Sequence, residues 1–116
     1  MIDDVDAAVD FYVTHLGFEL VWSAGAAFAE IARGNLHLLL SGATSSAARP
    51  MPDGRQPAPG GWNRIHLLVD DLAGEVERLG TAGVTFRSEI VSGPGGAQIV
   101  FDDPSGNPIE LFQPSR

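Results

Sequence analysis

The sequence contains no cysteine, so disulfide bonds and thiolate metal sites are both excluded. No apolar run approaches the roughly 20 residues that a transmembrane helix needs, and therefore no membrane partner is expected. The first four residues (MIDD) are acidic and lack the basic segment that begins a secretory signal peptide. Together these absences predict a cytoplasmic protein.

Basic residues are scarce. Lysine and arginine number 7 against 15 aspartates and glutamates, which gives a formal net charge of −8. Nucleic acids and anionic lipid surfaces both need a clustered basic surface, so neither is expected as a partner. A length of 116 residues, 44% of them hydrophobic, is typical of one compact domain and excludes a disordered chain.

An internal repeat organises the chain. Residues 3–9 (DDVDAAV) are echoed by residues 70–76 (DDLAGEV), and each segment leads through a helical pattern to a glycine. The two copies also end alike, with GNLHL at 34–38 and GNPIEL at 106–111. The offset between the copies grows along the chain, which loops of unequal length explain.

Each copy contains apolar residues at helical spacing in its first half. In the first copy, we expect a helix that begins after Asp3 or Asp4, whose carboxylates suit the N-cap, and ends at Gly17. In the second copy, we expect a helix that begins after the corresponding aspartate pair and ends near Gly83.

Alternating apolar patterns predict strands over residues 18–23, 27–32, 36–40, 65–69, 84–90, 97–102 and 108–113. The second copy therefore has the order strand, helix and three strands. The first copy has only Met1 and Ile2 before its helix, so its opening strand is missing. Either this module is truncated there, or the true start of the chain lies upstream of Met1.

A stretch rich in proline and glycine separates the two copies. It contains Pro50, Pro52, Pro57 and Pro59, which prevent a continuous helix or strand ladder. We therefore divide the chain into a first half-module at 1–42, a linker at 43–62 and a second half-module at 63–116. Together they form one domain of the α+β class.

The predicted strands carry polar groups on one face only, because successive side chains point to opposite sides. Their wholly apolar sides are expected to pack under the two helices. A one-residue slip in register would reverse this assignment. The opposite sides carry His37, Leu39, Arg64, His66, Leu68, Glu110 and Phe112. Such a mixture of large apolar and ionisable groups suits a ligand cavity.

Three segments resemble the vicinal oxygen chelate superfamily, which includes glyoxalase I, extradiol dioxygenases and bleomycin-resistance proteins. They are residues 3–18 (DDVDAAVDFYVTHLGF), 64–72 (RIHLLVDDL) and 102–111 (DDPSGNPIEL). The likeness covers nearly the whole chain outside the linker. It implies tandem βαβββ modules that form a curved mixed sheet with an open cup, helices on the outer face, and usually a homodimer.

The resemblance also implies a divalent metal in many members, bound by one residue from the first and last strands of each module. Glu110 falls on the last-strand position of the second module, and His37 on that of the first when one gap is allowed. Arg64 falls on the second module's first-strand position, where it cannot ligate a cation because it stays protonated. His66 is its substitute, and a His37, His66 and Glu110 set suits Zn²⁺, Ni²⁺, Mn²⁺ or Fe²⁺. The equally open alternative is that Arg64 pairs with Glu110 in a cavity without metal.

Two functions follow from these alternatives. The first is a metal-dependent lyase, isomerase or dioxygenase of the glyoxalase type, acting on a substrate with vicinal oxygens, in which Glu110 is a metal ligand or general base. The second is a metal-free protein that sequesters a drug or metabolite, as antibiotic-resistance members do. In either case we expect a small-molecule cavity lined by Trp62, Arg64, His66, Leu68, Phe101 and Phe112, the aromatic residues offering stacking area.

Overall fold

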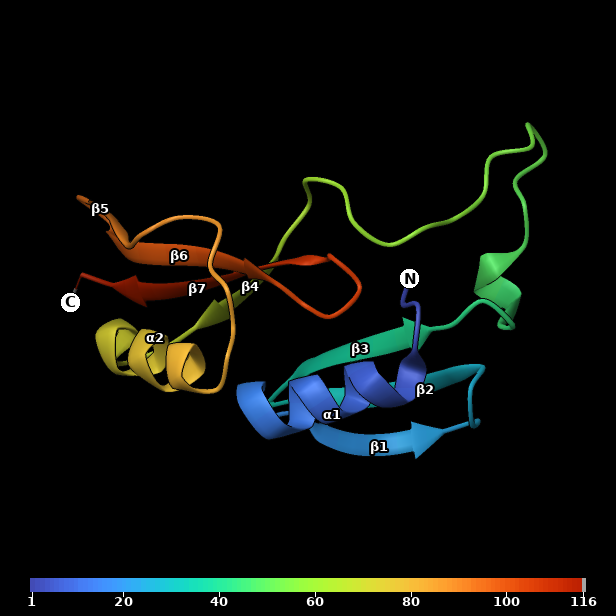
Figure 1. Cartoon of the computed structure of the whole chain (residues 1–116), viewed down its shortest axis with the longest axis horizontal. Helices are drawn as coiled ribbons and strands as arrows, with labels where there is room; N and C mark the ends of the chain where they lie inside the picture. Colours follow the sequence, from blue (N-terminus) through green and yellow to red (C-terminus); the bar gives the residue numbers. More distant parts are fainter. Residues whose placement is uncertain (116) are drawn as a thin grey trace. The chain divides into compact units, whose positions relative to one another are not determined.

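The computed structural model describes residues 1–115, which form two compact units. Unit 1 comprises Met1–Gly60 together with Asp103–Gly106, and unit 2 comprises Gly61–Asp102 and the chain from Asn107 onward. Figure 1 shows the elements in chain order. They are α1 (Val5–Leu16), β1 (Glu19–Ser23), β2 (Phe28–Arg33), β3 (Leu36–Ser41), the short 3-10 helix η1 (Ser46–Ala48), β4 (Ile65–Leu68), α2 (Leu72–Thr81), β5 (Val91–Gly93), β6 (Gly96–Asp102) and β7 (Pro108–Pro114).

In unit 1, α1 begins and ends where the sequence predicts. The Asp4 carboxylate accepts a hydrogen bond of 3.1 Å from the backbone N–H of Ala7, which satisfies one of the free donors of the first turn. Gly17 adopts the left-handed conformation at the C-terminus with φ of 71°. The buried residues of α1 share one face: Val5, Ala8, Tyr12 and Leu16. This face packs on the antiparallel sheet β1-β2-β3 (Figure 1).

Unit 1 also includes the turn Asp103–Gly106. The Tyr12 hydroxyl donates a 2.8 Å hydrogen bond to Oδ2 of Asp103, and the Asp3 N–H donates one of 2.9 Å to Oγ of Ser105. Both members of the first pair are buried. Two hydrogen bonds therefore hold this turn against the start and the middle of α1.

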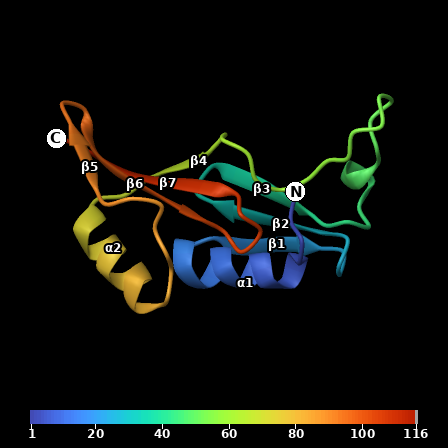
Figure 2. The ribbon, with the colours of Figure 1, turned by 45° about the horizontal axis from the view of Figure 1, so that its top comes forward.

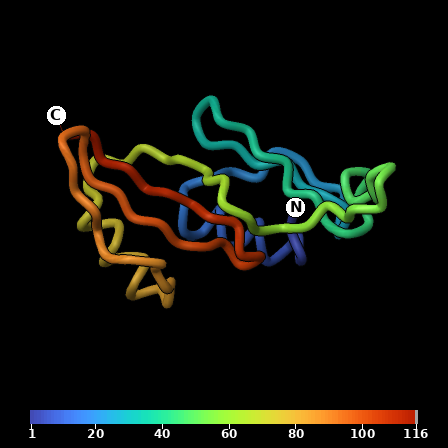
Figure 3. Tube along the Cα trace, turned by 90° about the horizontal axis from the view of Figure 1, so that it is seen from above, coloured from blue at the N-terminus to red at the C-terminus, as the bar shows by residue number. Residues whose placement is uncertain are grey.

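Unit 2 has the strand–helix–three-strand order that the repeat predicts. Its sheet has the order β4-β7-β6-β5, with β4 parallel to β7 and the other pairs antiparallel (Figure 3). The helix α2 lies on one face of this sheet (Figure 2). Asp71 caps α2 by accepting from the Gly74 N–H at 3.1 Å. The core beneath it consists of Leu67, Leu72, Leu79, Ile99, Phe101, Ile109 and Leu111. The predicted α+β class with modules of this order is confirmed.

The strand predicted over 84–90 is wrong. The structure has a strand only at Val91–Gly93, preceded by an isolated bridge between Phe86 and Phe101. Phe86 and Val91 are five positions apart, whereas their partners Phe101 and Gln98 are three positions apart. Two extra residues therefore interrupt the ladder between these pairs, as in a β-bulge. The apolar alternation at 84–86 is real, but the segment after it leaves the sheet.

Within residues 1–115, no helix is both long enough and apolar enough to cross a membrane.

Candidate functional site

The side of the unit 2 sheet that faces away from α2, here called the open face, carries a cluster of polar side chains centred on Glu110. Glu110 is only 9% exposed, although it lies on the side of β7 away from α2. Oε1 accepts a hydrogen bond from Nη1 of Arg64 at 3.0 Å, and Oε2 lies 3.0 Å from Nδ1 of His66. The parallel register of β4 and β7 places His66 directly opposite Glu110. Arg64 is two residues earlier on the same side, so the predicted cluster does assemble.

Other predicted cavity residues extend this face. Leu68 and Phe112 are paired positions of β4 and β7, and Leu68 is exposed. The ring of Phe112 lies 5.3 Å from that of His66, tilted by 40°. The face therefore joins one ionic cluster to an apolar surface.

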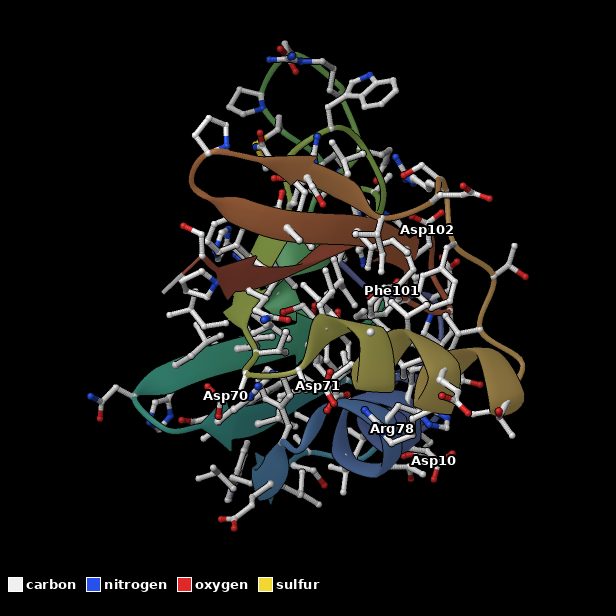
Figure 4. All side chains as sticks on the ribbon, turned by 90° about the vertical axis from the view of Figure 1, so that its left-hand side faces the viewer. Asp10, Asp70, Asp71, Arg78, Phe101 and Asp102 are labelled. Carbon is white, nitrogen blue, oxygen red and sulfur yellow. The ribbon has the colours of Figure 1, made fainter. Side chains whose placement is uncertain are left out.

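Phe101 does not belong to this face. Its side chain is 0% exposed and packs edge-on against Phe86 at a ring-centroid distance of 5.7 Å. Figure 4 shows it between the strands and α2. On β6 the open face instead carries Gln98, Val100 and Asp102, because side chains alternate. Phe101 is therefore a core residue rather than part of the cavity lining.

A pocket of about 260 Å³ lies beside the Glu110 cluster on the open face. Two of its residues, Trp62 and Arg64, are among those predicted from the sequence. Arg87 is one that sequence reasoning missed, because the residues around it were expected to form a regular strand. Its Nε donates to Oδ1 of Asp102 at 2.7 Å, and its guanidinium lies 5.8 Å from the ring centroid of Trp62. The other lining residues are Ser88, Val91, Gln98, Ile99, Val100 and Pro108.

His37 lies in unit 1, where Nδ1 is 2.7 Å from Oε2 of Glu30 on the neighbouring strand. Comparison of the two hairpins shows that it is not the counterpart of Glu110. The buried pair Ala29 and Leu40 of unit 1 corresponds to the buried pair Ile99 and Leu111 of unit 2. Leu39 precedes Leu40 in unit 1, and Glu110 precedes Leu111 in unit 2. Leu39 and Glu110 therefore occupy equivalent positions in the two hairpins.

Backbone contacts at the start of each module give the same correspondence. The Ile2 N–H donates to the carbonyl of Ser41 at 2.9 Å, as the Val69 N–H does to that of Phe112. The predicted alignment of His37 with Glu110 differs from this correspondence by two residues. The shared glycine accounts for one of them, because Gly34 lies four residues before Leu38 whereas Gly106 lies three before Ile109, and the gap allowed in the alignment accounts for the other. An exposed leucine, Leu39, therefore occupies the position where a last-strand ligand would stand.

The residues of unit 2 do not fit a divalent metal. Both Glu110 oxygens already contact nitrogen groups, and one of these is a guanidinium that cannot give up its charge. His66 and Glu110 are the two donors that unit 2 supplies, so a site with the three protein ligands of a typical catalytic zinc centre would need a further ligand from outside unit 2. Across residues 1–115, no three His, Cys, Asp or Glu side chains gather as a metal-binding group. The set of His37, His66 and Glu110 is divided between the two units and stays a prediction.

Comparison with known families decides the identity of this fold. The profile of the Glyoxalase/Bleomycin resistance protein/Dioxygenase superfamily matches residues 1–111. The chain belongs to this superfamily. The resemblance noted in the sequence is thereby confirmed. No curated protein sequence matches the chain significantly.

Solved structures of this superfamily's fold resemble the chain along nearly its whole length. A lactoylglutathione lyase from Agrobacterium tumefaciens is 25% identical with a TM-score of 0.77, over 97% of this chain and 87% of that one. A superfamily member from Sphaerobacter thermophilus is 29% identical with a TM-score of 0.76, over 97% and 90%. TnmS3, an antibiotic-binding protein from Streptomyces sp. CB03234, is 28% identical with a TM-score of 0.70, over 99% and 93%. An enzyme and a binding protein are thus similarly close, so the choice of function depends on the site.

Proposed function

We propose that this superfamily member binds a small molecule on the open face of unit 2 without a catalytic metal. The observation that carries this proposal is the ion pair between Arg64 and Glu110, at 3.0 Å. A fixed cation at this carboxylate repels a second cation and occupies the lone pairs that would bind it. Glu110 then serves to hold Arg64 and His66 at the edge of the pocket.

The character of the pocket supports binding. Trp62 is 86% exposed, and exposed aromatic area beside a cavity is a common means of holding an organic ligand. Several apolar residues and a few hydrogen-bond donors complete the lining. The likeness to TnmS3, whose name describes antibiotic binding, supports the same interpretation.

A metal-dependent lyase, isomerase or dioxygenase is the second candidate. The contact between His66 and Glu110 favours it, as does the likeness to a lactoylglutathione lyase. This function requires Arg64 to leave Glu110, and it requires at least one ligand besides His66 and Glu110. Zn²⁺, Ni²⁺, Mn²⁺ and Fe²⁺ are the ions for which such donors are suited.

Elemental analysis together with a thermal-shift screen separates the two candidates. We expect the purified protein to contain less than stoichiometric metal and to be stabilised by members of a diverse small-molecule library, with the stabilisation lost in Arg64→Ala. We expect Arg64→His, which adds a nitrogen donor beside Glu110, to increase zinc affinity. Stoichiometric metal in the unaltered protein, lost in Glu110→Ala, would overturn the metal-free proposal.

We also propose that the chain forms a homodimer. In unit 2, β4 covers the outer edge of β7, whereas in the part of the chain that the structure describes β3 pairs with β2 alone. At that edge the Ile2 N–H donates a hydrogen bond to the Ser41 carbonyl. Unpaired strand edges favour association with another chain. Light scattering during size-exclusion chromatography tests this, and a monomer at every concentration used for binding would refute it.

A further inference from the structure

The pocket beside Trp62 offers many N–H donors but has no net charge. Two arginines line it, and each is paired with a carboxylate: Arg64 with Glu110, and Arg87 with Asp102. Two positive charges are therefore matched by two negative charges. A guanidinium has five N–H groups in a planar fork, and the bonds to these carboxylates occupy only some of them. The others can serve a ligand.

The shape of the lining favours a flat molecule. The Trp62 indole is almost wholly exposed, and the Arg87 guanidinium lies near its ring at 5.8 Å from the centroid, a cation–π distance. Val100 and Pro108 supply apolar surface. The volume of about 260 Å³ lies just below the roughly 300–1,000 Å³ of typical ligand pockets. It therefore suits a compact ring system rather than a large glycopeptide.

We propose that this pocket takes an uncharged, planar aromatic ligand that carries a carbonyl oxygen. The rings stack against Trp62, and the oxygen accepts hydrogen bonds from Arg64 or Arg87. This inference rests on the proposed binding function and names its ligand class. Trp62 and Arg87 are the residues that set the specificity.

Charged ligands fit this pocket less well. An anion would compete with Glu110 and Asp102 for the same guanidinium groups, and it would approach a chain whose net charge is −8. A cation would be favoured by that net charge at long range, but within the pocket it would face the N–H groups of two arginines. A neutral carbonyl oxygen accepts hydrogen bonds from these N–H groups without disturbing either ion pair.

A matched series of tricyclic compounds tests the ligand class. Xanthone is neutral and has the carbonyl group, xanthene lacks it, xanthone-2-carboxylate adds a negative charge, and 9-aminoacridine is a cation. Each is titrated into the full chain carrying Trp22→Phe, so that Trp62 is the one remaining tryptophan and its fluorescence reports binding. Calorimetry on the unaltered chain gives independent affinities. We expect xanthone to bind at least about tenfold more tightly than each of the other three, since one good polar contact is worth about this ratio.

Variants locate the site and separate the contributions. Calorimetry on the chain with Trp62→Ala should show xanthone affinity reduced about tenfold, whereas Trp62→Phe should retain most of it because a ring remains. Arg87→Lys keeps the charge but loses the planar fork, so it should weaken xanthone more than xanthene. Arg55, which pairs with Asp53 outside this pocket, provides the matched control. Arg55→Lys should leave xanthone affinity unchanged, and circular dichroism verifies that each variant is folded.

The outcomes are distinguishable from failure of the proposed function. Tighter binding of the carboxylate or the aminoacridine, equal binding of xanthene, or an unaffected Trp62→Ala variant each overturns the ligand class. If the library screen finds an Arg64-dependent binder while none of the four tricyclic compounds binds, the proposed function stands and this inference fails. If the library finds no binder either, both fail.

Discussion

The hydroxyl of Tyr12 in α1 donates a 2.8 Å hydrogen bond to Oδ2 of Asp103, which lies 91 positions later in the chain. Both residues are buried. The other Asp103 oxygen, Oδ1, accepts from the backbone N–H of Ser105 at 2.9 Å. One carboxylate thus shapes its own turn and fixes that turn to the first helix.

We expect Tyr12→Phe to lower the free energy of unfolding by about 1–3 kcal/mol, because the buried Asp103 carboxylate loses a donor without regaining water. Urea denaturation followed by circular dichroism measures the change. Thr14 on the same helix supplies the control, since its hydroxyl contacts Asp10 at the surface at 3.3 Å. Thr14→Ala should change stability by less than about 0.5 kcal/mol. Equal effects of the two substitutions would contradict the importance assigned to the buried bond.

The same contact predicts a loss of stability in alkaline solution. Burial, and next the neighbouring Asp103 carboxylate, raise the pKa of Tyr12 above its ordinary value. The folded state therefore retains the phenolic proton above pH ~10, where the unfolded chain releases it. The stability that the raised pKa of Tyr12 contributes to the folded state is fully present below pH ~10 and declines as the pH rises above it. Unfolding curves between neutral pH and pH ~11 should show a smaller alkaline loss for Tyr12→Phe than for the unaltered chain, and parallel losses would refute this origin.

The helices could be predicted because their signals are local. Asp4, Asp71 and Gly17 act within one turn of their own positions, so sequence alone locates the ends of the helices. The pairing of β4 with β7 brings Arg64 and Glu110 together through the repeat pattern, which is also visible in the sequence. Alternation in 97–102 could have placed Phe101 in the core, because its polar neighbours Gln98 and Asp102 share the opposite side.

The position of His37 could not be read in the same way. Its register depends on the length of the β2–β3 turn, and the glycine shared by both copies suggests a shifted alignment, because this glycine lies one residue further from the equivalent strand position in the first copy. Arg87 depends on two extra residues in the segment before β5, whose departure from the sheet brings its side chain to Asp102 and Trp62. Both effects arise from cross-strand packing, which local patterns do not encode.

Gly96 offers a test of the β5–β6 hairpin. It has φ of 150°, and a Cβ added there would lie 2.2 Å from the carbonyl oxygen of Gln113. We expect Gly96→Ala to destabilise the protein by about 2 kcal/mol or more, because the backbone of β7 must move. Gly95→Ala is the matched control, since its Cβ would meet nothing within 4 Å. Thermal unfolding of both variants gives the comparison, and a fully stable Gly96→Ala would show that the hairpin adapts freely.

The Arg64–Glu110 pair makes a final prediction that concerns stability rather than binding. Arg64→Met removes one donor from a carboxylate whose side chain is only 12% exposed, and it should cost about 1–2 kcal/mol. Glu110→Leu alone leaves the guanidinium partly solvated, with 42% of its side chain exposed, so its cost should be smaller. The double variant Arg64→Met, Glu110→Leu should be less destabilised than the sum of the two, because no unpaired charge remains. Urea unfolding of the four proteins measures this coupling. Strict additivity would mean that the ion pair contributes nothing to the folded state, and the polar cluster would then be maintained by ligand binding alone.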